Sequence, residues 1–310
     1  MFPRANQTPI LIVTFCLLWS SAFAASKAAL IDCPPLLLVT ARCLLAGGLT
    51  LAIAAARPGA WRVSPRDFGV LILLGLANNA IYLGLNNLAM QSVAAGVTAL
   101  IASANPVLTA VLASVVLGDR MTWRKATGLG LGVVGVAIIV QHRIAIGADA
   151  PVGIAFAVAA LVAIVIGTIL FKRLRPGSSL WIGNGIQNLV AGLAVAPFAF
   201  AFESVSDVVP TWRLLCAVTF LVLFVSIVAY VIWFHLLTVI GPSAASAYHF
   251  LMLPLGVLFG WVLLAEHVEL SDLTGIIPIT IGIYLVTRGP IPAVEKSDIT
   301  PDAITVRCLD

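Results

Sequence analysis

Ten apolar runs, each 19 to 26 residues long, follow one another along the chain with short polar gaps between them. Their approximate ranges are 9–30, 34–56, 67–89, 92–117, 123–141, 151–171, 179–202, 212–236, 240–265 and 270–288. A helix of about 20 apolar residues spans a bilayer, and in lipid every backbone amide must be satisfied inside the helix. The pattern therefore predicts an all-α integral membrane protein with ten transmembrane helices.

The composition excludes several classes of protein. Of 310 residues, 61% are hydrophobic and only 10% are charged, whereas a soluble domain carries about 25% charged residues. A soluble enzyme and a disordered chain are therefore excluded, and so is a nucleic-acid partner, because the net charge of +4 sits in short gaps. The five cysteines and four histidines show no disulfide or metal spacing. We expect no metal and no cofactor.

The distribution of lysine and arginine predicts the orientation. With the N-terminus in the cytoplasm, 13 of the 17 lie inside, only Arg143 and Arg213 lie outside, and Lys27 and Arg42 lie within runs. This bias follows the positive-inside rule and requires an even number of spans. We expect a multi-pass protein of a bacterial-type inner membrane, with both termini in the cytoplasm. The first run also resembles a signal peptide ending at Ala22-Phe23-Ala24, but it is longer than the usual apolar region.

The two halves of the chain resemble each other weakly. Five pairs recur in order at offsets of 148 or 147 residues, namely Tyr82 and Tyr230, Pro106 and Pro254, Asp119 and Glu266, Gly128 and Gly275, and Gly135 and Gly282. Because each half holds five spans, an odd number, the copies must be inverted relative to each other. We expect a cytoplasmic N-terminus (1–8), a first repeat (9–141), an external linker (142–150), a second repeat (151–288) and a disordered cytoplasmic tail (289–310).

Short motifs recur in both halves in a matching order. They are Pro35, Arg42, Leu88-Ala89, Ala94-Ala95-Gly96, Asn105-Pro106 and Leu117-Gly118-Asp119, then Gly241-Pro242-Ser243-Ala244-Ala245, Leu253-Pro254 and Ala265-Glu266. Their order and spacing resemble the drug/metabolite transporter superfamily, in its ten-helix branch with two EamA-type repeats. Asp119 departs from that family, which more often has Glu there. The resemblance implies two inverted five-helix halves around a central cavity, without nucleotide hydrolysis. Among members, the chain is most similar to bacterial exporters of amino acids, including aromatic ones, and related metabolites.

Polar side chains inside membrane spans are costly unless they face a cavity or one another. Two stripes at helical spacing are expected to line the central cavity: Asn78, Tyr82 and Asn86 beside Asn79, and Ser226, Tyr230 and Trp233. An amide-and-aromatic lining suits a small zwitterion with an apolar side chain. The alternative is hydrogen bonding between helices.

Further candidates lie in four other spans. Trp19 and Ser20 near mid-depth of the first run, and Tyr248 and His249 before Pro254, are added to the substrate cavity. Arg42 lies too deep to reach the surface easily; it either bonds backbone carbonyls or faces a substrate carboxylate. Pro106 and Pro254 at equivalent places predict a hinge for each gate, with a static bend as the alternative.

The function expected from these features is secondary transport. All 13 acidic residues lie in loops, tails or span edges, so export of amino acids or related metabolites by alternating access is facilitated or weakly proton-coupled, with His249 as the one proton carrier. The alternatives are a channel-like pore or a multidrug efflux protein of the same fold, and then a membrane-embedded enzyme. The expected partners are a small molecule and the lipid bilayer. The glycine face of the fifth run leaves a homodimer open, and the sequence leaves open the substrate, the coupling and the resting gate.

Overall fold

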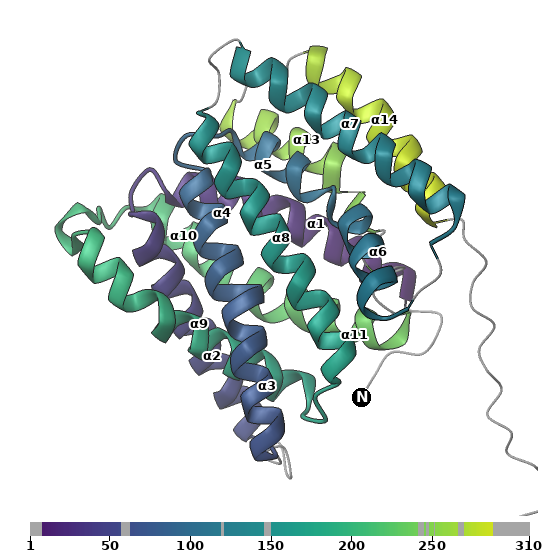
Figure 1. Ribbon diagram of the computed structural model, residues 1–310. Helices are drawn as coiled ribbons and strands as arrows, with labels where there is room; N and C mark the ends of the chain where they lie inside the picture. Colours follow the sequence, from purple (N-terminus) through teal and green to yellow (C-terminus); the bar gives the residue numbers. More distant parts are fainter. Residues whose placement is uncertain are drawn as a thin grey trace, which may run out of the picture.

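The computed structural model describes residues 8–56, 63–118, 121–145, 150–240, 245, 248–250, 252–265 and 270–287. These residues form helices and contain no strand, so the all-α prediction is confirmed for this part of the chain (Figure 1). The helices of the first half are α1 (Thr8–Ala29), α2 (Pro35–Ala55), α3 (Pro65–Gly75), η2 (Leu76–Ile81), α4 (Tyr82–Ala89), α5 (Ala95–Ala102), α6 (Asn105–Val116) and α7 (Trp123–Ala145). Those of the second half are α8 (Pro151–Leu174), α9 (Leu180–Phe202), η3 (Val205–Asp207), α10 (Trp212–Phe220), η4 (Leu221–Ala229), α11 (Tyr230–Val239), η5 (Tyr248–Phe250), α13 (Met252–Leu264) and α14 (Leu270–Thr287).

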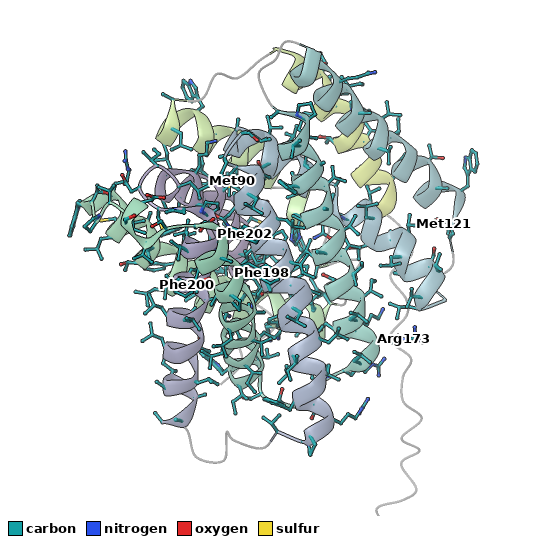
Figure 2. All side chains as sticks on the ribbon, turned by 60° about the vertical axis from the view of Figure 1, so that its left-hand side comes forward. Met90, Met121, Arg173, Phe198, Phe200 and Phe202 are labelled. Atoms are coloured by element: carbon teal, nitrogen blue, oxygen red, sulfur yellow. The ribbon has the colours of Figure 1, made fainter. Side chains whose placement is uncertain are left out.

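Seven helical runs in the described residues are long and apolar enough to cross a membrane. They are 8–29, 35–55, 65–89, 95–116, 151–174, 180–202 and 212–239. The outward surface is apolar as well, since large hydrophobic side chains such as Phe198, Phe200 and Phe202 of α9 are exposed (Figure 2). Exposed aromatic side chains on long apolar helices are what a lipid-facing surface requires.

Two pairs of helices pack closely through small residues. A methyl group added at Gly47 of α2 would lie 2.7 Å from the Leu189 nitrogen of α9, and one at Gly192 of α9 would lie 3.0 Å from the Leu44 nitrogen of α2. The pair α7 and α14 lies side by side at one edge of the molecule (Figure 1), where Gly282 faces the backbone of Gly128. Glycine lets helix backbones approach each other, which favours van der Waals packing in lipid.

Two membrane runs contain a π-helical segment at equivalent places. In η2 the last π bond runs from the Tyr82 N–H to the Ala77 carbonyl, and in η4 it runs from the Tyr230 N–H to the Val225 carbonyl. The sequence pattern assumed a continuous α-helix through both regions. A π turn carries an additional residue, so side chains before it are rotated relative to those after it. Asn78 therefore faces a different neighbour from Tyr82.

The run over residues 95–116 is interrupted in the middle. α5 ends at Ala102, α6 begins at Asn105, and Pro106 is the second residue of α6. Pro254 is the third residue of α13, which follows the short η5. Proline is tolerated in the first helical turn, because the N–H group it lacks has no partner there anyway. Pro106 thus stands just after a break between α5 and α6, and Pro254 stands in the first turn of α13.

Candidate functional site

A small cavity lies among α1, α2, α4, η4 and α11, and the space inside it, about 20 Å³, holds about one water molecule. It brings together five residues that the sequence nominated, namely Trp19, Arg42, Tyr82, Asn86 and Tyr230. The first three elements belong to one half of the chain and the last two to the other. Both halves therefore build the wall of one small chamber.

Arg42 supplies the charge of this cavity. Its side chain is buried, 3% exposed, and lies seven residues into α2, about 10 Å along the helix from Pro35. The Arg42 Nε atom donates a hydrogen bond to the Ser226 hydroxyl of η4, at 2.8 Å. Among the described residues, no carboxylate lies within ion-pair distance of Arg42 and none accepts a hydrogen bond from its two terminal nitrogens. A buried cation in this situation favours an anionic ligand.

The Ser226 contact is itself held by a neighbouring helix. The Ser226 carbonyl accepts a hydrogen bond from Asn184 Nδ2 of α9 at 2.8 Å. The side chain of Asn188, one turn further along α9, donates to the carbonyl of Asn184 at 2.9 Å. These amides bond other protein groups and do not line the cavity, so they fix the residue that orients Arg42.

Aromatic rings form the apolar wall of the cavity. The ring centroids of Trp19 and Tyr230 lie 4.9 Å apart, and Tyr82 lines the same space. The Tyr230 hydroxyl donates to the Asn78 carbonyl at 3.2 Å. That bond ties the residue after one π segment to the backbone of the other π segment, so it links the two halves next to the cavity.

Asn78 and Asn79 lie outside the cavity wall. Asn78 Nδ2 points to Gln187 Oε1 of α9 at 3.5 Å, and the Asn78 side chain lies against Gly167 of α8. Both polar side-chain atoms of Asn79 are buried without a hydrogen-bond partner in the described part of the chain. Of the stripe predicted at Asn78, Tyr82 and Asn86, only the last two line the cavity, because η2 breaks the regular spacing.

A second aromatic cluster, formed by Phe15, Trp233 and His249, contacts the cavity residue Trp19. The His249 ring is 4.8 Å from Trp233 and 5.8 Å from Trp19, and Phe15 stacks on Trp233 at 5.4 Å. Trp19 thus belongs to both groups. His249 and Trp233 do not line the cavity.

Three more nominated residues lie apart from the cavity wall. The buried Ser20 hydroxyl has no hydrogen-bond partner among the residues described. The Tyr248 carbonyl accepts a hydrogen bond from the Cys16 thiol at 3.3 Å. Ser226 reaches the cavity only through its bond to Arg42.

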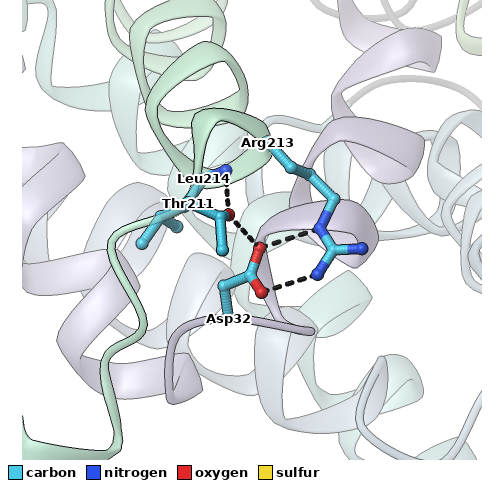
Figure 3. A network of polar contacts seen from close by, with 4 residues as sticks. All are labelled: Asp32, Thr211, Arg213 and Leu214. Carbon is cyan, nitrogen blue, oxygen red and sulfur yellow. Dashed lines mark hydrogen bonds and ion pairs between the residues drawn. The ribbon is translucent and has the colours of Figure 1, made fainter.

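A charged network joins the two halves at the ends of α1, α2 and α10 (Figure 3). Arg213 donates two hydrogen bonds to the Asp32 carboxylate, from Nε at 2.8 Å and from Nη2 at 2.6 Å. The Thr211 hydroxyl donates to the same carboxylate at 2.6 Å and accepts from the Leu214 N–H at 3.1 Å. The hydrogen bond from Arg213, followed by that from Thr211, holds the pKa of Asp32 below its usual value.

Glu203 strengthens this junction from the end of α9. Its two carboxylate oxygens accept the N–H groups of Leu36 and Leu37 at 2.9 Å and 2.7 Å. These N–H groups belong to the first turn of α2, where no helical acceptor exists and the helix dipole favours a negative charge. Glu203 is therefore a cap supplied by the other half of the chain. We name the contacts of Asp32, Thr211, Arg213 and Glu203 the rim network.

Sequence reasoning missed part of the cavity and the whole rim network. Phe23, Ser26 and Val225 line the cavity but were not nominated. Phe23 and Ser26 follow Trp19 at i+4 and i+7, so extending the helical period from Trp19 finds them. Lys27, on the same helix, donates to the carbonyls of Met90 and Val93, where a cation is favoured after the end of α4.

Comparison with protein families gives one match that covers most of the chain. The model of the EamA-like transporter family matches residues 7–141 and 151–288. The resemblance inferred from the sequence motifs is thereby confirmed. A solved crystal structure superposes with a TM-score of 0.65 over 92% of this chain and 98% of the other, at 19% identity, which shows a shared fold.

Several relatives are named as transporters. The uncharacterized transporter YvbV of Bacillus subtilis is 28% identical over 91% of this chain and 92% of its own length. A probable terminal-alkyne amino-acid exporter of Streptantibioticus cattleyicolor is 35% identical over 39% of this chain and 40% of its own. An S-adenosylmethionine/S-adenosylhomocysteine transporter of Chlamydia muridarum is 25% identical, with 80% and 81% covered.

Proposed function

The chain belongs to the EamA-like transporter family and is a multi-pass membrane protein, and we propose that it exports amino acids or related small metabolites by alternating access. The observation that carries this proposal is the buried guanidinium of Arg42 in a cavity walled by aromatic rings. In a more open state of the transport cycle, its terminal N–H groups would hold a carboxylate and the surrounding rings would contact an apolar side chain. No chemical conversion of the substrate is part of the proposal.

The names of two relatives are consistent with such a substrate. One is described as a probable exporter of terminal-alkyne amino acids and another as a transporter of S-adenosylmethionine and S-adenosylhomocysteine. All of these molecules carry an α-carboxylate. A single cationic side chain in an otherwise apolar and amide-lined chamber suits that shared group.

The packing of helices supports an arrangement of ten spans in two inverted repeats. α2 packs on its counterpart α9, and α7 packs on its counterpart α14. α1 packs on α10, η4 and α13, while its counterpart α8 packs on α4, η2 and α6. At the level of whole spans, these contacts of α1 and α8 are equivalent, as a pseudo-twofold axis requires. Exchange of the two halves' conformations would then open the cavity first to one side and then to the other.

The proposed orientation puts both termini in the cytoplasm of a cell with a bacterial-type inner membrane. The rim network then lies on the external side, at the ends of helices that line the cavity further inward. In the proposed cycle this junction separates when the cavity opens outward. In this cycle the substrate binds to Arg42 and to the aromatic rings of α1, α4 and α11, which belong to both halves of the chain.

The test is counterflow of radiolabelled L-phenylalanine, L-leucine and L-methionine in proteoliposomes. We expect saturable uptake of at least one of them, stimulated by unlabelled substrate inside, since a transporter shows trans-stimulation and a pore does not. Arg42→Gln should lose this flux, whereas Arg66→Gln, which removes an exposed arginine outside the cavity and the rim network, should retain it. Non-saturable flux, or flux unaffected by Arg42→Gln, would contradict the proposal.

A further inference from the structure

The cavity is lined by one cationic side chain, Arg42, and by no described carboxylate. The structure describes four acidic side chains, and none of them lines the cavity. Asp32 is bonded by Arg213, Glu203 caps α2, Asp67 lies in the first turn of α3 and Asp207 is exposed in η3. A zwitterionic substrate would therefore find a partner for its carboxylate but no anionic partner for its ammonium group.

The other polar groups of the wall offer little to an ammonium ion. Asn86 and Ser26 present neutral oxygen atoms, and the Tyr230 hydroxyl already donates to the Asn78 carbonyl. The rings of Trp19 and Tyr82 give a cation–π surface, which is weaker than an ion pair. Arg42 repels a second cation in the same small space. Burial of the ammonium group is therefore poorly compensated here, while burial of the carboxylate is well compensated.

We propose that this cavity selects for the carboxylate alone, so that the α-amino group of a substrate is dispensable and des-amino acids are ligands too. This inference rests on the proposed function and defines its substrate class as small monocarboxylates with an apolar side chain. The amino acids form one part of that class. Amines without a carboxylate are excluded by the charge of Arg42.

Three matched series of compounds test the selection by calorimetric titration of the full chain in lipid nanodiscs. Each series contains an amino acid, its des-amino acid and its decarboxylated amine. The series are L-phenylalanine with 3-phenylpropionate and phenethylamine, L-leucine with 4-methylpentanoate and isopentylamine, and L-methionine with 4-(methylsulfanyl)butanoate and 3-(methylsulfanyl)propylamine. We expect the des-amino acid to bind at least as tightly as the amino acid, and the amine to bind about tenfold more weakly or worse.

Each outcome distinguishes the inference from the function beneath it. An amino acid that binds tenfold more tightly than its des-amino acid would overturn the inference, yet the proposed transport of amino acids would stand. Amines that bind where acids do not would overturn both. If no carboxylate of any series bound, the inference would also fall, and the counterflow experiment would decide the function separately.

Two variants locate the selection on one side chain. In Arg42→Gln the advantage of the acid over the amine should disappear, because the only described charge of the cavity is gone. In Arg213→Gln the advantage should persist unchanged. Persistence of the advantage in Arg42→Gln would place carboxylate binding elsewhere and overturn the inference.

Discussion

Two arginines join the halves of this protein, and their surroundings are opposite. Arg213 lies at the rim, where the Asp32 carboxylate accepts two of its N–H groups. Arg42 lies deeper, where the one described acceptor is the neutral Ser226 hydroxyl. The first cation is neutralised by Asp32, whereas no carboxylate of the described residues neutralises the second.

This difference assigns the two arginines different roles. A neutralised ion pair at a helix junction serves assembly, because each partner satisfies the other. A buried cation without a counterion lowers the stability of the folded chain unless something else supplies the anion. The residue that is costly for folding is therefore the residue expected to meet the substrate.

The largest expected effect follows from Arg42→Met. A hydrogen bond to a charged group contributes about 1.5–3 kcal/mol, so removal of the cation should weaken carboxylate binding by about 10-fold to 150-fold. The thermal unfolding midpoint, Tm, should stay the same or rise, because an uncompensated buried charge is replaced by an apolar side chain. Thermal melts with and without 3-phenylpropionate measure both quantities. A variant that melts much earlier and binds normally would reverse the assignment.

Arg213→Gln should have the contrary profile. It leaves the Asp32 carboxylate, whose residue is 5% exposed, without its cation, so Tm should fall while ligand affinity remains within about twofold. The double variant Asp32→Asn with Arg213→Gln should recover part of that loss, since both charges are then absent. Failure of the double variant to recover any stability would argue against an ion-pair role.

Tyr230→Phe should produce a smaller change. It removes the hydrogen bond to the Asn78 carbonyl and keeps the ring, at a cost of about 0.6 kcal/mol, the average for such bonds in membranes. Because the ring that lines the cavity is kept, ligand affinity should fall about threefold or less. Tyr230→Ala, the matched control, also deletes the ring beside Trp19 and should weaken binding further. Equal affinities for the two variants would show that the Tyr230 ring does not contribute to ligand binding.

The smallest effect concerns acid pH. The pKa of Asp32 is lowered in the folded chain, so its stabilisation is present above the unfolded value of about 3.9 and is lost as pH falls through the folded value. The difference in Tm between the native chain and Asp32→Asn should be constant from about pH 5 to 8 and should shrink below about pH 4. A difference that grows on acidification would contradict the sign of the shift.

The sequence predicted more of the cavity than of the contacts around it. Five residues of the cavity could be predicted because a polar or amphipathic side chain deep in an apolar run is costly without a function. They are Trp19, Arg42, Tyr82, Asn86 and Tyr230. Helical periodicity then showed which of these residues share one face of a helix. Burial cost and periodicity are local properties, so they can be read along the chain.

Other features depend on structure that the sequence pattern does not encode. The π segment η2 turns Asn78 towards Gln187 and so separates it from the stripe that regular spacing predicted. The bond between Asp32 and Arg213 joins residues 181 positions apart, and only the packing of α1 on α10 brings them together. Predictions that fall on Asp119, Glu266 and Ser243 lie outside the described residues.

A crystal structure of the chain with 3-(4-bromophenyl)propionate tests directly whether Arg42 binds the carboxylate. The anomalous signal of bromine locates the ring, and the difference density locates the carboxylate. We expect the carboxylate within hydrogen-bond distance of the terminal nitrogens of Arg42, with the ring against Trp19 and Tyr230. A ligand bound with its carboxylate away from Arg42 would show that Arg42 is not the carboxylate site.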